Sequence, residues 1–306
     1  MLTFCKTADT INSALAHFSA IPDFTLPTTA AKIYLLGKCA ETVEFKVFSF
    51  KCPVTGFESF AVLRMFKPNP SRSYLVFGAA TNAKFADETI KQVFDELAEL
   101  VPEFFTSGTM TLGTEVLAPQ INKCLSEKFP DFDFIPYPTQ MYYMTKSQQT
   151  VFMDSIKDGI KLPDGYVFDK ANFDTDLETI LDTWLHKAPG EEPYLRTKLS
   201  HLPNSLIRHI PTGDAASCEH IDAVGLMTHQ FTIKEHRQKG LGTAVEKDMC
   251  RQLISLGLTP FKCVELYNVN LLKASDNTVY WTRRDCDIGK PSVTTYLEII
   301  SKKTDN

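Results

Sequence analysis

The stretch that decides the fold is Phe231-Thr232-Ile233-Lys234-Glu235-His236-Arg237-Gln238-Lys239-Gly240-Leu241-Gly242-Thr243. Its apolar beginning predicts the end of a strand. The spacing of Leu241, Val245, Met249 and Leu253 predicts a helix that begins at the glycines and ends near Gly257. A strand, a short basic turn and a helix therefore follow one another with no linker between them.

Two glycines, one residue apart, open this helix. Glycine lets a ligand come close to the backbone, and the first four amides of a helix have no acceptor within it. The helix dipole adds positive potential at the same end, and Arg237 and Lys239 add formal charge. This combination predicts a site for a pyrophosphate.

The pattern Arg-x-x-Gly-x-Gly is weak by itself, since average residue usage produces the family of patterns Arg/Gln-x-x-Gly-x-Gly/Ala about 0.3 times in a chain of this size. A plain helix start with a solvated basic turn is the alternative that the residues alone leave open. The nicotinamide fingerprint is excluded because the third glycine of Gly-x-Gly-x-x-Gly is missing, and no Walker A sequence is present.

The first half of the chain predicts a sheet with a helix. Alternating and continuous apolar runs predict antiparallel strands at residues 43–48, 57–66 and 74–77. An apolar face predicts a helix over 90–100, ended by Pro102, and another strand is expected at 140–144.

The second half mixes helices and strands as well. A helix capped by Asp174 and ended by Pro189 and Gly190 is expected, with Trp184 in the core. Asn268 is expected to cap a short helix. Further elements are a helix at 194–199 and strands at 165–168, 205–210, 218–230, 261–267, 279–282 and 293–299. This order predicts the α+β class.

Composition narrows the class of protein. The 306 residues are 43% hydrophobic and 23% charged, as in a folded globular protein, and the net charge of -5 gives no general attraction to nucleic acid. No apolar run reaches the roughly 18 residues of a membrane span. The eight scattered cysteines and the absence of a leader pattern indicate a reducing compartment, cytoplasmic or alternatively mitochondrial.

The segment 231–243 resembles motif A of the Gcn5-related N-acetyltransferase (GNAT) superfamily, which binds the pyrophosphate of acyl-coenzyme A. Residues 167–208, 221–225 and 232–237 are similar to one branch, the glycine N-acyltransferases. The resemblance implies a splayed, mostly antiparallel sheet flanked by helices. It implies a catalytic domain at 148–306 and a degenerate acyltransferase-like domain at 1–147, which lacks an Arg-x-x-Gly-x-Gly of its own.

The resemblance also implies which residues contact coenzyme A. Asn268 would lie along the pantetheine arm. Ser275, seven positions later, stands where many superfamily members have a tyrosine that protonates the leaving thiolate, and Ser275 could only donate a hydrogen bond. The remaining expected contacts are Phe231, Thr232, Ile233, Arg237, Gln238, Lys239, Gly240, Leu241, Gly242 and Thr243.

The expected catalytic base is missing. In the glycine acyltransferases a glutamate stands eleven positions before the motif arginine, and here that position is Leu226. His229 is the replacement that we expect, because a histidine suits a base at neutral pH. His236 and Asp222 are weaker alternatives, and an acceptor amine of low pKa would need no base at all.

An amino-acid acceptor would need a cation for its carboxylate, and Arg208, Arg283 and Arg284 are candidates by their predicted places in the sheet. No metal is expected. The residues that could suggest one lack a paired ligand spacing; they are His201, His209, Cys218 and His220.

The sequence therefore predicts an acyltransferase that moves an acyl group from acyl-CoA to the amine of a small molecule such as glycine. Neither nucleic acid nor a membrane is expected as a partner, and a monomer is expected. Two alternatives remain: a coenzyme-A-binding protein without turnover, and a protein N-acetyltransferase.

Overall fold

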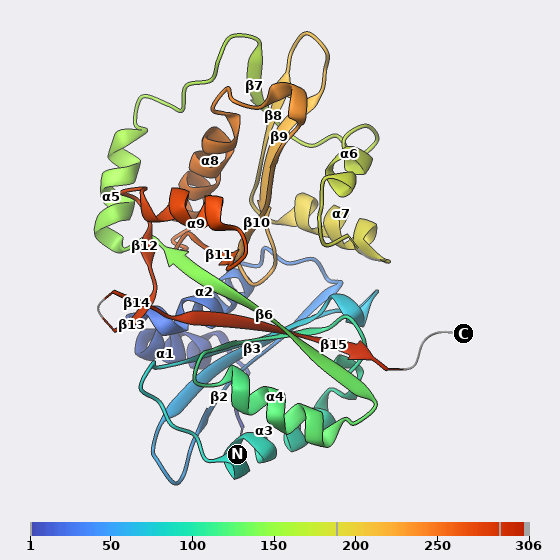
Figure 1. Cartoon of the computed structure of the whole chain (residues 1–306), viewed down its shortest axis with the longest axis vertical. Helices are drawn as coiled ribbons and strands as arrows, with labels where there is room; N and C mark the ends of the chain where they lie inside the picture. Colours follow the sequence, from blue (N-terminus) through green and yellow to red (C-terminus); the bar gives the residue numbers. More distant parts are fainter. Residues whose placement is uncertain (1, 188, 288, 303–306) are drawn as a thin grey trace.

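The computed structural model describes residues 2–187, 189–287 and 289–302. Within these residues, thirteen strands form one continuous sheet with helices on both faces (Figure 1). The strand order is β1 (Thr3–Cys5), β2 (Val43–Lys51), β3 (Glu58–Phe66), β4 (Tyr74–Ala79), β5 (Met110–Thr114), β15 (Val293–Ser301), β6 (Phe132–Tyr143), β11 (Phe261–Glu265), β10 (Met227–Thr232), β9 (Ala215–Ile221), β8 (Asn204–His209) and β7 (Tyr166–Asp169), with β12 (Thr282–Arg283) beside β6.

In the described part of the first half, four helices cover the sheet. Helices α3 (Asp87–Leu100) and α4 (Ala118–Lys128) pack on one face, where Phe77, Phe94 and Leu297 are buried. Helices α1 (Ala8–Phe18) and α2 (Thr25–Leu35) pack on the other face. The strands β2, β3 and β4 are antiparallel, as the sequence predicts.

Two strands join the halves of the chain. β6 pairs with β15 through residues 132–140 and with β11 through residues 139–143. β15, which comes last in the sequence, lies between β5 and β6 and so completes the sheet of the first half (Figure 1). The predicted division after residue 147 stays a prediction.

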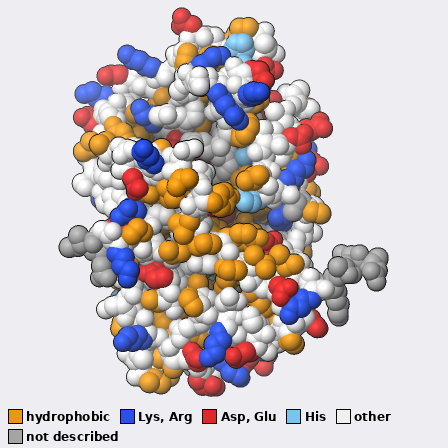
Figure 2. Space-filling model, in the orientation of Figure 1, with side chains coloured by type: hydrophobic (Ala, Val, Ile, Leu, Met, Phe, Trp, Pro, Cys, Tyr) orange, Lys and Arg blue, Asp and Glu red, His pale blue; other side chains and the backbone are white. Residues whose placement is uncertain are grey.

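On the face of the molecule drawn in Figure 2, apolar side chains gather across the middle. Two apolar side chains of β6, Ile135 and Tyr137, are exposed.

The sheet opens between β10 and β11. Throughout the described chain these two parallel strands pair at a single position, Met227 with Lys262, and then diverge. Helices α5 (Lys146–Ser155), α8 (Leu241–Ser255) and α9 (Val269–Asp276) lie on one face of this half. Helices α6 (Leu177–Asp182) and α7 (Glu191–His201) lie on the opposite face.

The fold class predicted from the sequence is confirmed: an α+β architecture with a mixed, mostly antiparallel, splayed sheet between helices. Three local expectations are wrong. The strand expected at 279–282 is a turn at Val279 and Tyr280, and of this range only Thr282 belongs to a strand, β12. The helix after Asp174 begins at Leu177 and ends at Asp182, because Asp176, not Asp174, closes the preceding turn by accepting the amide of Asn172 at 2.7 Å. Trp184 is only half-buried, since it lies beyond that helix. Among the described residues no helix is both long and apolar enough to cross a membrane.

Candidate functional site

A hollow of about 400 Å³ lies between the start of α8, the diverging strands and α9. The fold brings most of the predicted contact residues to its wall: Thr232, Arg237, Gln238, Gly240, Leu241, Gly242, Thr243 and Ser275. Residues that sequence reasoning missed complete the wall, among them Glu246, Lys262, Tyr280 and Trp281. The hollow is not lined by the other predicted residues, which are Phe231, Ile233, Lys239, Asn268 and His229.

The glycine turn is shaped for an anion. Gln238 and Gly240 both have positive φ, 60° and 78°. A Cβ at Gly240 would meet no atom within 4 Å, so the space above this residue is open. The first backbone hydrogen bond of α8 is donated by Ala244 N to Gly240 O at 3.0 Å. The amides before Ala244 have no acceptor within the helix and point out of its start. Such a turn is suited to a phosphate group.

The two cations of the turn point in different directions. Arg237 Nε donates to Thr232 O at 2.9 Å, and its guanidinium lies over the ring of Phe231 at 5.3 Å. Lys239 Nζ donates to Tyr166 Oη at 2.7 Å. Arg237 therefore stays on the wall of the hollow, whereas Lys239 is held on the side of β7.

The inner wall carries an unsatisfied polar atom. Ser275, on α9, is 1% exposed, and its Oγ has no hydrogen-bond partner. Nearby, Glu246 Oε1 accepts from Trp281 Nε1 at 2.6 Å and from Lys262 Nζ at 3.1 Å. A buried hydroxyl without a partner is costly in a folded protein, so a ligand group in the hollow is expected to supply the partner.

Asn268 caps α9, as the sequence predicts. Its Oδ1 accepts the amide of Leu271 at 3.3 Å. This bond occupies the side chain at the open end of the splay, so its first role is to fix the start of the helix that carries Ser275.

His229 lies at an irregularity of β10, where the pairing with β9 shifts register between Thr228 and Phe231. Its φ is 54°. Nε2 is 3.0 Å from Thr183 Oγ1 and Nδ1 is 3.3 Å from His220 Nε2. Burial, with further help from the cation of Lys198, lowers the pKa of His229 to about 3. Its imidazole is therefore neutral at pH 7 but a weak base.

The position of the missing glutamate is part of the core. Leu226 is 7% exposed and packs in the apolar cluster beneath α1 and α2, with Phe24 and Leu26. Asp222, at the start of the same turn, accepts the amide of Val224 at 2.8 Å. Burial raises the pKa of Asp222. Leu226 is thus a packing residue, and the turn around it is closed by Asp222.

The three arginines proposed for an acceptor carboxylate are already paired, so these expectations lose their basis. Arg208 binds Asp169 and Asp176 at 2.5 and 2.7 Å. Arg283 and Arg284 bind other carboxylates of the chain: Asp285 at 2.7 Å for Arg283, and Asp23 and Glu115 at 3.0 Å each for Arg284. The pKa of Arg208 is raised by its bonds to these carboxylates.

A buried charge cluster that the sequence did not reveal lies near His229. Arg64 is fully buried, and its guanidinium donates to Tyr194 Oη and Arg72 O. Lys198 Nζ and Arg72 Nε lie 3.4 Å from the two oxygens of Glu191. We call Arg64, Arg72, Glu191, Lys198 and Asp222 the buried charge cluster. Burial lowers the pKa of Lys198, and Glu191 opposes that effect.

The four residues considered for a metal do not meet as a group. His201 is exposed at the end of α7, Cys218 is buried against α6, and His220 contacts His229. His209 lies elsewhere, beside His236.

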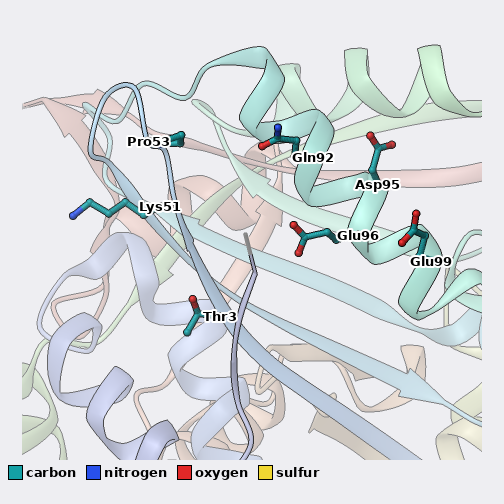
Figure 3. Close-up of a pocket in the computed structure, with 7 residues that line it drawn as sticks. All are labelled: Thr3, Lys51, Pro53, Gln92, Asp95, Glu96 and Glu99. Atoms are coloured by element: carbon teal, nitrogen blue, oxygen red, sulfur yellow. The ribbon is translucent and has the colours of Figure 1, made fainter.

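A second hollow lies far from the glycine turn, between the start of the chain, β2 and α3. Figure 3 shows Asp95, Glu96 and Glu99 along α3, with Thr3 and Lys51 across from them. Asp95 is paired with Lys91 at 2.8 Å and with Lys128 at 2.5 Å. Glu96 accepts the amide of Leu2 at 3.0 Å. Asp95 and Glu96 thus join α3 to its neighbours, and no motif residue lines this hollow.

Comparisons with known proteins place the fold. No protein-family model and no curated protein matches the chain. A Drosophila protein of solved structure, described without an activity, has a TM-score of 0.70 at 11% identity over 99% of both chains, which shows that it shares the fold.

Other solved structures similar to this chain are described as GNAT-family proteins. A GCN5-related N-acetyltransferase from Kribbella flavida has a TM-score of 0.48 and 12% identity over 80% of this chain and 87% of its own. A GCN5-related N-acetyltransferase-like protein from Streptococcus suis has a TM-score of 0.44 and 12% identity over 95% and 99%. Both scores fall below 0.5, and these two likenesses assign neither a family nor an activity to the chain.

Proposed function

We propose that this chain is a GNAT-type N-acyltransferase that uses acyl-CoA as its acyl donor. One observation carries the proposal: two parallel strands part after Met227 and Lys262, the open Gly240 turn stands at the mouth of the gap, and the unpartnered Ser275 Oγ lies inside it. A long ligand with a pyrophosphate at one end and a thioester at the other fits this arrangement.

Different residues would bind the two parts of the coenzyme, its pyrophosphate and its pantetheine arm. The amides of Leu241, Gly242 and Thr243 would bind the pyrophosphate, with Arg237 adding charge. The edge of β10 beyond Met227 has lost its pairing with β11, so the backbone groups of Phe231–Ile233 would pair with the amides of the pantetheine arm.

The acyl group would pass directly from the thioester to the acceptor amine. The lone pair of the acceptor nitrogen attacks the thioester carbonyl carbon, a C–N bond forms, and the C–S bond breaks with its electrons on sulfur. The acceptor nitrogen loses one proton and the thiolate takes one up. Ser275 Oγ–H would donate a hydrogen bond to the departing sulfur, which stabilises the developing negative charge.

We propose that the acceptor reacts as the free amine, without a carboxylate base. Leu226 is committed to the core, and both nitrogens of His229 are hydrogen-bonded. The low pKa of His229 makes it a poor proton acceptor. His229 as base stays a prediction, to be tested with the pH profile described below.

The acceptor that we propose carries a carboxylate, as glycine does. The support is electrostatic: the buried charge cluster has three cations, Arg64, Lys198 and the partly exposed Arg72, against the two carboxylates of Glu191 and Asp222. Helix α7, which carries Lys198, packs with α6 on the face of the sheet where His229 Nε2 contacts Thr183, the residue that follows α6. An excess of positive charge in a largely buried cluster favours an anion nearby.

Release of free thiol from a panel of acyl-CoA thioesters tests the proposal. Glycine and glycinamide are compared as acceptors, each at the pH that gives the same concentration of neutral amine. A preference for glycine of at least about 10-fold, or roughly 1.4 kcal/mol, supports a carboxylate acceptor. Equal rates would contradict it and leave acyl transfer itself standing.

Coenzyme-A binding without turnover is the second candidate, because Leu226 replaces the expected glutamate and His229 has a low pKa. Saturable CoA binding with no thiol release from any pair of acyl-CoA and amine would favour it. Acylation of peptides but not of free amines would favour a protein N-acetyltransferase.

A further inference from the structure

Three elements converge behind the glycine turn, at the edge of the proposed coenzyme site, whose wall includes His236. His209 ends β8, Asp214 lies in the turn before β9, and His236 lies in the short 3-10 helix η4 (Lys234–His236). One ligand atom of each side chain lies within 4.8 Å of the other two. Two imidazoles and a carboxylate at this separation are a donor set for a transition metal.

The hydrogen bonds of His209 fix which of its nitrogens is free. Nδ1 is 2.8 Å from Thr212 Oγ1, and that hydroxyl donates its only proton to Asp214 Oδ2 at 2.5 Å. Nδ1 must therefore be the donor to Thr212. In the neutral ring Nε2 then carries a lone pair. A histidine that binds a metal has this pattern, with one N–H held by a neighbour and the other nitrogen free.

His236 has a matching neighbour. Its Nδ1 is 2.9 Å from Tyr166 Oη, an oxygen that also accepts from Lys239 Nζ. In the metal-free ring Nε2–H can donate to Asp214 Oδ2, which is 3.4 Å away. This distance is long for a charge-assisted hydrogen bond, which is usually about 2.7–2.9 Å. If Nδ1 carries the proton and donates to Tyr166 Oη instead, the lone pair of Nε2 is free to bind a metal. His236 is buried and Asp214 is half exposed, so one side of the site is open to water.

We propose that His209, Asp214 and His236 bind one zinc ion, with water as the fourth ligand. Zinc suits two imidazoles and one carboxylate in a tetrahedral arrangement. The ion would join the β8–β9 turn to η4, the segment directly before Arg237. The proposal differs from the sequence-based expectation of no metal, because the spacing of these residues does not show that β8, the following turn and η4 meet.

The experiment measures metal binding without coenzyme A, so its outcome is independent of the proposed acyl transfer. Purified protein is stripped with a chelator and titrated with Zn²⁺ against a chromophoric competitor, then with Co²⁺ under visible absorption. We expect one equivalent bound and a tetrahedral Co²⁺ spectrum without a thiolate charge-transfer band, which separates this site from the eight free cysteines.

Variants locate the site. His209→Gln and Asp214→Asn should each weaken Zn²⁺ binding by more than about 100-fold, and Thr212→Val, which removes an outer partner, by about 10–100-fold. His17→Gln is the matched control, since His17 also faces a carboxylate, Glu58 at 3.0 Å, and belongs to no three-ligand group among the described residues. Circular dichroism checks the fold of each variant. Absence of stoichiometric binding, or equal affinity in His209→Gln, Asp214→Asn and the wild type, would overturn the proposal.

Discussion

Nδ1 of His229 lies 3.3 Å from Nε2 of His220, so two buried imidazoles share one hydrogen bond in the face of the sheet opposite α8. Burial lowers the pKa of both rings, that of His229 to about 3. A histidine of depressed pKa binds fewer protons in the folded chain than in the unfolded chain. Its contribution to stability is therefore present above the unfolded pKa and is lost as the pH falls.

This pair predicts a pH-dependent stability. Between an unfolded pKa of about 6.5 and the folded value of about 3, the free energy of unfolding should decrease as the pH is lowered. His229 alone should cost the wild type about 2 kcal/mol between pH 7 and pH 5. Urea unfolding of His229→Gln should show a smaller loss over the same interval. His201→Gln, which removes an exposed histidine, should keep the wild-type slope.

The rate of acyl transfer provides a separate test of His229. Because a group of pKa about 3 is a poor base at neutral pH, thiol release should follow the ionisation of the acceptor amine in both the wild type and His229→Gln. A loss of about 10²–10⁴-fold in His229→Gln, with the fold retained, would show instead that this histidine is the general base.

Leu226→Glu should destabilise the chain without restoring a base. The new carboxylate would be buried among Phe24, Leu26 and other apolar side chains, where its pKa would rise. The expected loss is several kcal/mol at pH 8 and less at pH 4, because a raised folded pKa makes stability decline as the pH rises. The control is Leu226→Gln, because glutamine has the same size as glutamate and carries no charge. If unfolding of Leu226→Glu shows no more pH dependence than Leu226→Gln, Leu226 does not occupy an apolar site.

Ser275→Ala should separate stability from function. Since Ser275 Oγ is buried without a partner, its removal should raise the free energy of unfolding of the free protein by about 1 kcal/mol. Thiol release should fall by at least about 10-fold, because a hydrogen bond to the leaving sulfur is lost. Ser205 also has a buried Oγ without a partner but lies away from the hollow. Ser205→Ala should therefore gain stability at unchanged activity, and equal activity losses would contradict the role of Ser275.

The buried charge cluster should be sensitive to the loss of one member. Lys198→Met leaves Glu191 buried with Arg72, which is 3.4 Å away, and should cost about 3–5 kcal/mol in unfolding free energy. Lys187→Met removes an exposed pair with Asp182 and should cost less than about 1 kcal/mol. An equal loss of unfolding free energy in Lys198→Met and Lys187→Met would contradict the claim that the burial of Lys198 makes its charge costly to remove.

The sequence predicted the elements whose pattern is local. The glycines at 240 and 242 and the apolar stripe of α8 identify the turn and its helix without reference to the rest of the fold. Helix α2 was missed for a physical reason: it is buried on almost every side, from Thr25 to Ile33, so it has no polar face and no helical period.

The rest of the site depends on tertiary contacts. Arg208 is paired because β7 and α6 bring Asp169 and Asp176 to it, and neither pairing follows from spacing in the sequence. The same holds for Lys198 and Glu191. The position of β15 between β5 and β6 likewise results from the sheet as a whole.

Binding of coenzyme A to a pair of matched glycine variants tests the central claim most directly. Gly240 and Gly257 flank α8, both have positive φ (78° and 73°), and a Cβ at either would meet no atom within 4 Å. Of these two glycines, Gly240 lines the hollow and Gly257 does not. By calorimetry, Gly240→Asp should bind coenzyme A more than about 100-fold more weakly than the wild type, close to 3 kcal/mol, and Gly257→Asp should bind it as the wild type does. A folded Gly240→Asp protein with unchanged affinity would contradict the assignment of the coenzyme site.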